Sequence, residues 1–129
     1  MVKSALYISI LFFVSSTHLF SQDTTENIRL AFNAGSTKEL IRYFSKVTEL
    51  KIDNEGKNYT ISQAEPIIRD FFKENPPSTF EYIHKGESPQ GLKYNIGQYK
   101  SSTKTYRIVV FLKKENDQYL IDTINFNRQ

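Results

Sequence analysis

The sequence predicts an α+β domain in which N-terminal helices pack on a curved, mostly antiparallel sheet. Three observations predict this class. Helix-start signals followed by apolar residues at helical spacing recur between residues 23 and 77. After residue 77 apolar and polar residues alternate, which is the period of a strand. Clusters of Gly, Ser, Asn and Asp then divide this second part into separate segments.

The first two predicted helices each begin at a capping box, in which a Ser, Thr or Asp residue precedes Glu by three positions. Asp23 and Glu26 form the first box, and Gly35 is expected to end that helix in the left-handed conformation. Ser36 and Glu39 form the second box. The apolar stripes are Ile28, Ala31 and Phe32 in the first helix and Leu40, Ile41 and Phe44 in the second.

A hairpin and a third helix follow. Residues 47–52 and 57–60 are expected to pair around a turn in which Gly56 takes a positive φ. Ser62 and Glu65 are interpreted as a third capping box, with Pro66 in the first turn of the helix. The stripe of this helix is Ala64, Ile67, Ile68, Phe71 and Phe72, and the two prolines that follow end it.

Four strand segments complete the domain. They are Ser78–Lys85, Leu92–Ser101, Lys104–Lys113 and Gln118–Phe126. Because their connections are short, they are expected to form an antiparallel meander. Gly97, in the middle of the second segment, is expected to mark a bulge where the sheet bends.

The N-terminus is typical of a secretory signal peptide, assigned to residues 1–21. Lys3 precedes an apolar run from Ala5 to Val14, and the segment SSTHLFS then ends at the small residue Ser21. The run is about half of the ~20 residues that a membrane span needs. The sequence therefore predicts one domain at residues 22–129, exported to the periplasm or the extracellular space as a soluble protein.

The composition excludes several classes of function. The chain has no Cys, which excludes disulfides, lipidated cysteines and thiol nucleophiles. His84 is the only histidine after the leader, so no typical zinc site and no cofactor are expected. The formal net charge of +3, which includes Lys3, gives no reason to expect nucleic-acid binding. The 10 Phe and 8 Tyr residues predict an aromatic core.

The order of helix, helix, hairpin, helix and four strands resembles the nuclear transport factor 2-like (cystatin-like, SnoaL-like) superfamily, a cone of curved sheet closed by helices. The segments FFKENPP (71–77) and YRIVVFLKKENDQYLIDTINF (106–126) are similar to exported Bacteroidetes proteins catalogued as a domain of unknown function. The resemblance implies the fold. It leaves the activity open, because the superfamily includes isomerases, dehydratases, ligand binders and dimerisation modules.

An enzyme or ligand binder of this fold would use the interior of the cone. On the first long strand, alternation places Phe80, Tyr82 and His84 on one face, so Tyr82 and His84 are candidates for orienting a ligand. The alternative is a packed tyrosine beside an exposed histidine. Tyr94 is a further candidate for ligand contact. Together with Tyr99 and Tyr106 it is expected to be exposed on the open sheet face, where a homodimer could form.

Asp122 is the candidate base. Alternation on the last strand groups it with Leu120, Ile124 and Phe126, and apolar surroundings would raise the pKa of a carboxyl group there. The superfamily's isomerases use an acidic base with a tyrosine donor, which would be Tyr82 or His84 here. The alternative is that Asp122 lies on the outer face or pairs with a basic residue.

The sequence favours a non-catalytic module that binds a small apolar ligand or an envelope protein. The reason is that no set of polar residues converges on one point. The alternative is a cofactor-free isomerase or dehydratase that uses the cone pocket. A subunit of an envelope complex is a third possibility.

Overall fold

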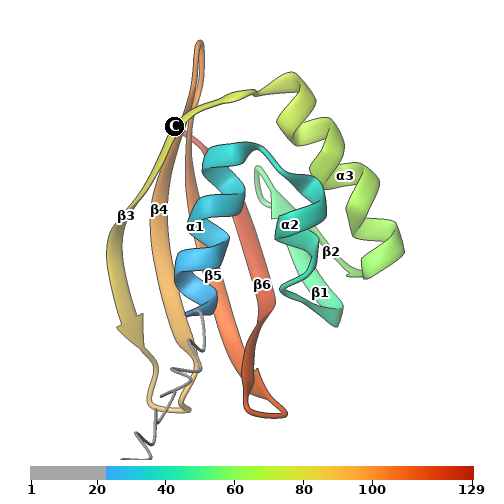
Figure 1. The fold of residues 1–129 in the computed structure, drawn as a ribbon, viewed down its shortest axis with the longest axis vertical. Helices are drawn as coiled ribbons and strands as arrows, with labels where there is room; N and C mark the ends of the chain where they lie inside the picture. Colours follow the sequence, from blue (N-terminus) through green and yellow to red (C-terminus); the bar gives the residue numbers. More distant parts are fainter. Residues whose placement is uncertain (1–22) are drawn as a thin grey trace, which may run out of the picture.

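The computed structural model describes residues 23–129, so the predicted leader lies outside the described residues. Three helices cover one face of a six-stranded sheet (Figure 1). The helices are α1 (Thr24–Ala34), α2 (Thr37–Ile41) and α3 (Ile61–Glu74). The strands are β1 (Phe44–Ile52), β2 (Glu55–Thr60), β3 (Pro77–Glu87), β4 (Lys93–Ser101), β5 (Thr105–Glu115) and β6 (Gln118–Arg128). The predicted α+β class and the curved, mostly antiparallel sheet are confirmed.

The strand order β2-β1-β6-β5-β4-β3 joins the early hairpin to the late meander. Strands β3 to β6 form the expected antiparallel meander, and β1 pairs with β2 in the expected hairpin. Strand β1 lies parallel to β6. This single parallel contact brings the end of α2 beside the last strand, which matters for the site described below.

The first two helix starts are close to the prediction. The Asp23 side chain accepts a hydrogen bond from the Thr25 N–H (3.0 Å), and Gly35 ends α1 at φ 60°. Glu26 does not complete the expected capping box, because its carboxylate pairs with Arg29 at 2.6 Å. Ser36 caps α2 as predicted. The expected second stripe is wrong at Phe44, which begins β1 instead.

The details of α3 and of the hairpin turn differ from the prediction. The capping box of α3 is formed by Thr60 and Gln63, two residues before the expected one. Pro66 consequently lies in the second turn. In the hairpin, Asp53 and Asn54 take the positive φ angles (50° and 70°), as a type I′ turn requires. Gly56 instead pairs with Lys51 within the strand.

Several register shifts interrupt the alternation of side chains in the sheet, and two of them are bulges at or beside candidate residues. In β3, Tyr82 lies opposite Gly97 and His84 opposite Ile96, so Ile83 is an extra residue. The expected bulge therefore lies in β3, across from Gly97 rather than at it. In β6, Thr123 lies opposite Phe111 and Ile121 opposite Leu112, which makes Asp122 the extra residue. Beyond each bulge the side chains change face.

The core lies between the helices and the sheet. Its largest members are Tyr99, Phe32, Phe80 and Phe126, all fully buried, with Phe71, Phe72 and Tyr106 packed beside them. Phe32 is central, because its ring centroid lies 4.6 Å from that of Phe80 and 6.1 Å from that of Phe126. The side chain of Asn33 exchanges two hydrogen bonds with the backbone of Phe80 (2.9 and 3.0 Å). This contact covers part of the edge strand β3.

Candidate functional site

Aromatic rings fill the interior of the cone. The ring of Phe71 lies 4.6 Å from Phe126 and 5.0 Å from Tyr106, measured between centroids. The Tyr99 hydroxyl donates to the Asn75 carbonyl. Tyr99 is fully buried and Tyr106 is 6% exposed, so the expectation that they lie on an open sheet face is wrong. The space in which an interior ligand was expected is thus occupied by the core.

Tyr82 faces the helices, and its hydroxyl donates to the backbone carbonyl of Thr25 in α1 (2.6 Å). Burial raises the pKa of Tyr82, and the negative charges of Asp23 and Glu26 raise it further. The hydroxyl is neutral at physiological pH and already donates its proton to a backbone group. In this arrangement Tyr82 fixes the start of α1 against β3.

His84 and Tyr94 lie together on the opposite, outer face of the sheet. The bulge at Ile83 turns His84 away from Tyr82, so the expectation that Tyr82 and His84 share a face is wrong. The His84 Nε2 lies 3.2 Å from the Tyr94 hydroxyl, and the two rings are 5.5 Å apart between centroids. Of the three candidate ligand contacts, the structure brings together His84 and Tyr94 and separates them from Tyr82.

Asp122 occupies the bulge in β6 and is half-buried. Ile121, rather than Asp122, shares the inner face with Ile124 and Phe126, and all three are fully buried. The expected grouping of Asp122 with Ile124 and Phe126 is therefore wrong. The Asp122 carboxylate accepts a hydrogen bond from the hydroxyl of the adjacent Thr123 (3.3 Å). Neither Tyr82 nor His84 hydrogen-bonds to this carboxylate.

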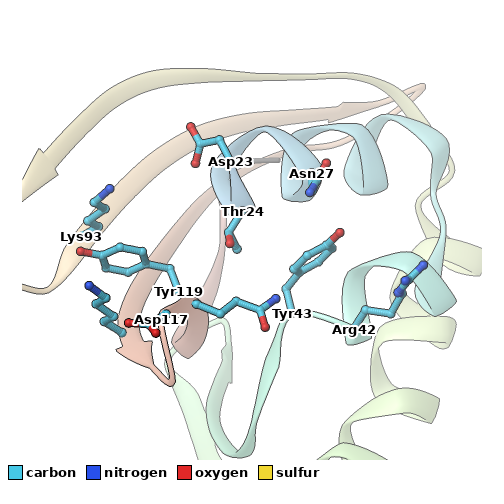
Figure 2. Close-up of a pocket in the computed structure, with 10 residues that line it drawn as sticks. Asp23, Thr24, Asn27, Arg42, Tyr43, Lys93, Asp117 and Tyr119 are labelled. Carbon is cyan, nitrogen blue, oxygen red and sulfur yellow. The ribbon is translucent and has the colours of Figure 1, made fainter. Parts of the chain in front are cut away.

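The candidate site is an open groove of about 760 Å³ at the end of the cone where α1 begins (Figure 2). We call it the rim groove. Four segments form it: the start of α1, the two residues that follow α2, the start of β4, and the turn between β5 and β6 with the strand residues beside it. Its lining residues are Asp23, Thr24, Asn27, Arg42, Tyr43, Lys93, Lys114, Asp117, Gln118 and Tyr119.

Strand pairing explains why these residues meet. The backbone N–H of Ile121 donates to the carbonyl of Tyr43 (2.7 Å), which holds the end of α2 against β6. Asn116 and Asp117 form a tight turn with positive φ angles (47° and 63°). This turn places Lys114 directly across from Tyr119. The rim groove therefore depends on both the parallel and the antiparallel neighbours of β6.

Several charged groups of the rim groove already interact with other groups of the protein, each in a different way. The Lys93 Nζ lies 4.3 Å from the ring centroid of Tyr119, a cation–π distance, and Figure 2 shows the two side chains together. Arg42 pairs with Glu39 at 3.3 Å. Asp23 accepts the capping hydrogen bond of α1. A smaller hollow of about 280 Å³ adjoins the groove, since Asp23 and Lys93 line both.

The lining of the rim groove is suited to binding polar molecules. It offers two tyrosine rings, neutral hydrogen-bonding groups and charges of both signs.

Between residues 23 and 129 there is no group of three or more His, Asp or Glu side chains that could hold a metal ion. In the same stretch no helix is long and apolar enough to cross a membrane. Sequence reasoning missed this groove. The only part of it that the local sequence could indicate is the pairing of Lys114 with Tyr119 beside the turn between β5 and β6.

The profile of a family described as a domain of unknown function (DUF4783) matches residues 25–127. The chain belongs to this family. The match confirms the resemblance to proteins catalogued as a domain of unknown function. No curated protein matches the chain in sequence.

Solved structures of DUF4783 proteins have the same fold. One from Bacteroides uniformis is 23% identical with a TM-score of 0.77, covering 83% of this chain and 98% of that one. One from Bacteroides ovatus is 28% identical with a TM-score of 0.75, covering 80% and 93%. A nuclear transport factor 2-like protein of unknown function from Shewanella baltica is 10% identical with a TM-score of 0.63, covering 81% and 87%. The last likeness concerns the fold alone.

Proposed function

We propose that this DUF4783 protein is an exported, non-catalytic binding module whose ligand site is the rim groove. The observation that carries the proposal is the filled interior. Phe32, Phe71 and Phe126 occupy the space that a pocket would need. The buried hydroxyls of Tyr82 and Tyr99 already donate to backbone carbonyls. A ligand must then bind at the surface, where the rim groove offers concave shape and polar lining together.

The enzyme alternative gains no support from the arrangement of the candidate residues. That alternative requires Asp122, with Tyr82 or His84, to converge on one cavity. Tyr82 donates to α1, His84 contacts Tyr94 on the outer face, and Asp122 lies at a bulge in β6. General acid–base chemistry needs these groups within hydrogen-bond reach of one substrate.

A screen of small polar molecules by NMR tests the rim groove. We expect amide shift changes at Lys93, Tyr119 and their neighbours, and we expect Tyr119→Ala to abolish them. The matched control is Tyr94→Ala on the outer face, which should bind normally. Circular dichroism on both variants separates lost binding from lost folding. Ligand shifts confined to the outer face, or no shift with any compound, would refute the proposed site.

The outer sheet face is a second candidate site, for a protein partner or a second copy. Its centre is apolar and half-buried, formed by the cross-strand pairs Tyr94–Phe111 and Ile96–Val109. Light scattering tests this function, because Ile96→Glu would convert a dimer into a monomer. A wild-type chain that stays monomeric at high concentration would exclude the homodimer, and pull-down from an envelope fraction would then test for other partners.

Export is proposed from the N-terminal sequence alone. The charged start, the short apolar run and the small residue at Ser21 support cleavage near Gln22. N-terminal sequencing of the protein recovered from an envelope or culture fraction should begin at or near Gln22. A chain recovered intact from the cytoplasm would contradict export.

A further inference from the structure

We propose that the rim groove binds an acidic saccharide, with a sugar ring against Tyr119 and the carboxylate between Lys93 and Lys114. The inference deepens the proposed function and rests on it. The Lys93 Nζ lies 4.3 Å from the Tyr119 ring centroid, and Lys114 is the cross-strand partner of Tyr119. The ammonium group of Lys93 therefore lies over the Tyr119 ring, and Lys114, on the strand position opposite Tyr119, lines the same groove.

The two lysines are available to a ligand. The four ion pairs between residues 23 and 129 are Arg29–Glu26, Arg42–Glu39, Lys51–Glu49 and Arg69–Glu65. Neither Lys93 nor Lys114 takes part in them. An ammonium group beside an aromatic ring keeps N–H donors, and an ionised acceptor such as a carboxylate forms stronger hydrogen bonds with them than a neutral one does.

The charge balance selects a ligand with few negative charges. Asp23 and Asp117 also line the groove, so its field is only weakly positive. The Asp23 carboxylate already uses part of its hydrogen-bonding capacity, because it accepts the hydrogen bond from the Thr25 N–H. Arg42 forms an exposed ion pair with Glu39 at 3.3 Å, which offsets part of its charge. One carboxylate fits this balance, whereas a dense polyanion such as a nucleic acid would meet both aspartates.

The neutral lining favours a saccharide over a fatty acid. Thr24, Asn27 and Gln118 offer a hydroxyl and two amides, which can both donate and accept hydrogen bonds with sugar hydroxyls. Tyr43 and Tyr119 supply aromatic faces on which the C–H side of a sugar ring can pack. The adjoining hollow beyond Lys93 gives room for more than one sugar unit. An alkyl chain would leave these polar groups desolvated and unpaired.

Calorimetric titration with a trisaccharide that carries a single galacturonate unit, and with its methyl ester, tests the proposal. The ester keeps the sugar rings and removes the charge. We expect the acid to bind at least tenfold more tightly than the ester, and added salt to weaken only the acid. The double variant Lys93→Gln/Lys114→Gln should bind acid and ester equally weakly. Lys57→Gln, an exposed lysine on β2, is the matched control and should bind like the wild type.

The outcomes separate this inference from the proposed function. Equal binding of acid and ester, equal loss in Lys57→Gln, or equally tight binding of a triglutamate peptide would overturn the acidic saccharide. NMR shifts at Tyr119 with other compounds would then leave the groove as a binding site. If neither the saccharides nor the compounds of the wider screen shift any amide signal of the groove, the acidic-saccharide inference and the proposed binding function of the groove are both overturned.

Discussion

Replacing Phe32 with Ala measures directly whether the interior of the cone is a core. Phe32 is fully buried at the centre of the aromatic cluster. The neighbouring ring centroids are those of Phe80 at 4.6 Å, Phe72 at 5.8 Å, Tyr99 at 6.0 Å and Phe126 at 6.1 Å. Truncating a well-packed Phe costs about 3–5 kcal/mol. Four aromatic neighbours place the expected loss at the upper end, about 4–5 kcal/mol.

Urea unfolding at neutral pH is the assay. With an m-value of about 2 kcal/mol per molar urea, Phe32→Ala should lower the unfolding midpoint by roughly 2 M. Leu30→Ala is the control on the same helix, since Leu30 is 51% exposed, and it should cost under about 0.5 kcal/mol. If Phe32→Ala does not fold, Phe32→Leu should still lose about 1 kcal/mol. A loss below about 1 kcal/mol for Phe32→Ala in a folded protein would mean that the interior is open, and would refute the filled-core argument.

Three further predictions concern residues outside the groove. Because burial raises the pKa of Tyr82, the folded state keeps a proton that the unfolded chain releases above pH ~10. Tyr82 alone should therefore lower the free energy of unfolding by up to about 1.4 kcal/mol per pH unit above pH ~10, and Tyr82→Phe should remove this part of the slope in denaturant titrations at pH 9 to 11. Asn33→Leu removes two hydrogen bonds to Phe80 and should cost about 2 kcal/mol in thermal unfolding. It should also speed amide exchange at Phe80, and unchanged exchange there would contradict the edge-covering role. Asn54→Val should destabilise the hairpin by about 1–2 kcal/mol, because φ is 70° there, whereas Asn54→Gly should be neutral or stabilising.

The elements that sequence reasoning predicts well are those decided by local chemistry. The Asp23 side chain accepts a hydrogen bond from the Thr25 N–H, and that of Ser36 from the Glu39 N–H. Gly35 takes the left-handed conformation, as the capping rules require. The four late strands follow from alternation and from the turn residues between them. Even where the register shifts, as in the Thr60–Gln63 box of α3, the error is two residues.

The sheet faces on which His84 and Asp122 lie were harder to predict, because the position of a bulge depends on how two strands pair and not on the sequence of one strand. Alternation in β3 alone cannot show that Ile83 is extra, since that depends on how Gly97 pairs. The same holds for Asp122 in β6. Each bulge moves a candidate residue away from the expected face, so an error of one residue in register reverses the functional interpretation.

The rim groove depends on contacts between distant segments. Tyr43 reaches it through the parallel contact of β1 with β6, a pairing that no local pattern signals. Lys93 reaches it through the register of β4 on β5. Lys114 and Tyr119 are the exception, because counting outward from the two-residue turn at Asn116 and Asp117 pairs them correctly.

A filled interior and a binding site at the rim follow from the same physical constraint. The chain has no Cys, so its stability must come from buried area without help from disulfides. An empty apolar cavity costs about 24 cal/mol per Å³, so a ligand pocket of ~300 Å³ would cost about 7 kcal/mol. That is comparable to the whole stability of a small domain, about 5–15 kcal/mol. A polar groove at the rim avoids this cost, because Lys93, Lys114 and Tyr119 are partly or fully exposed to water when no ligand is bound. In this chain the aromatic interior can therefore serve stability alone, and substitutions in the rim groove should change binding without unfolding the domain.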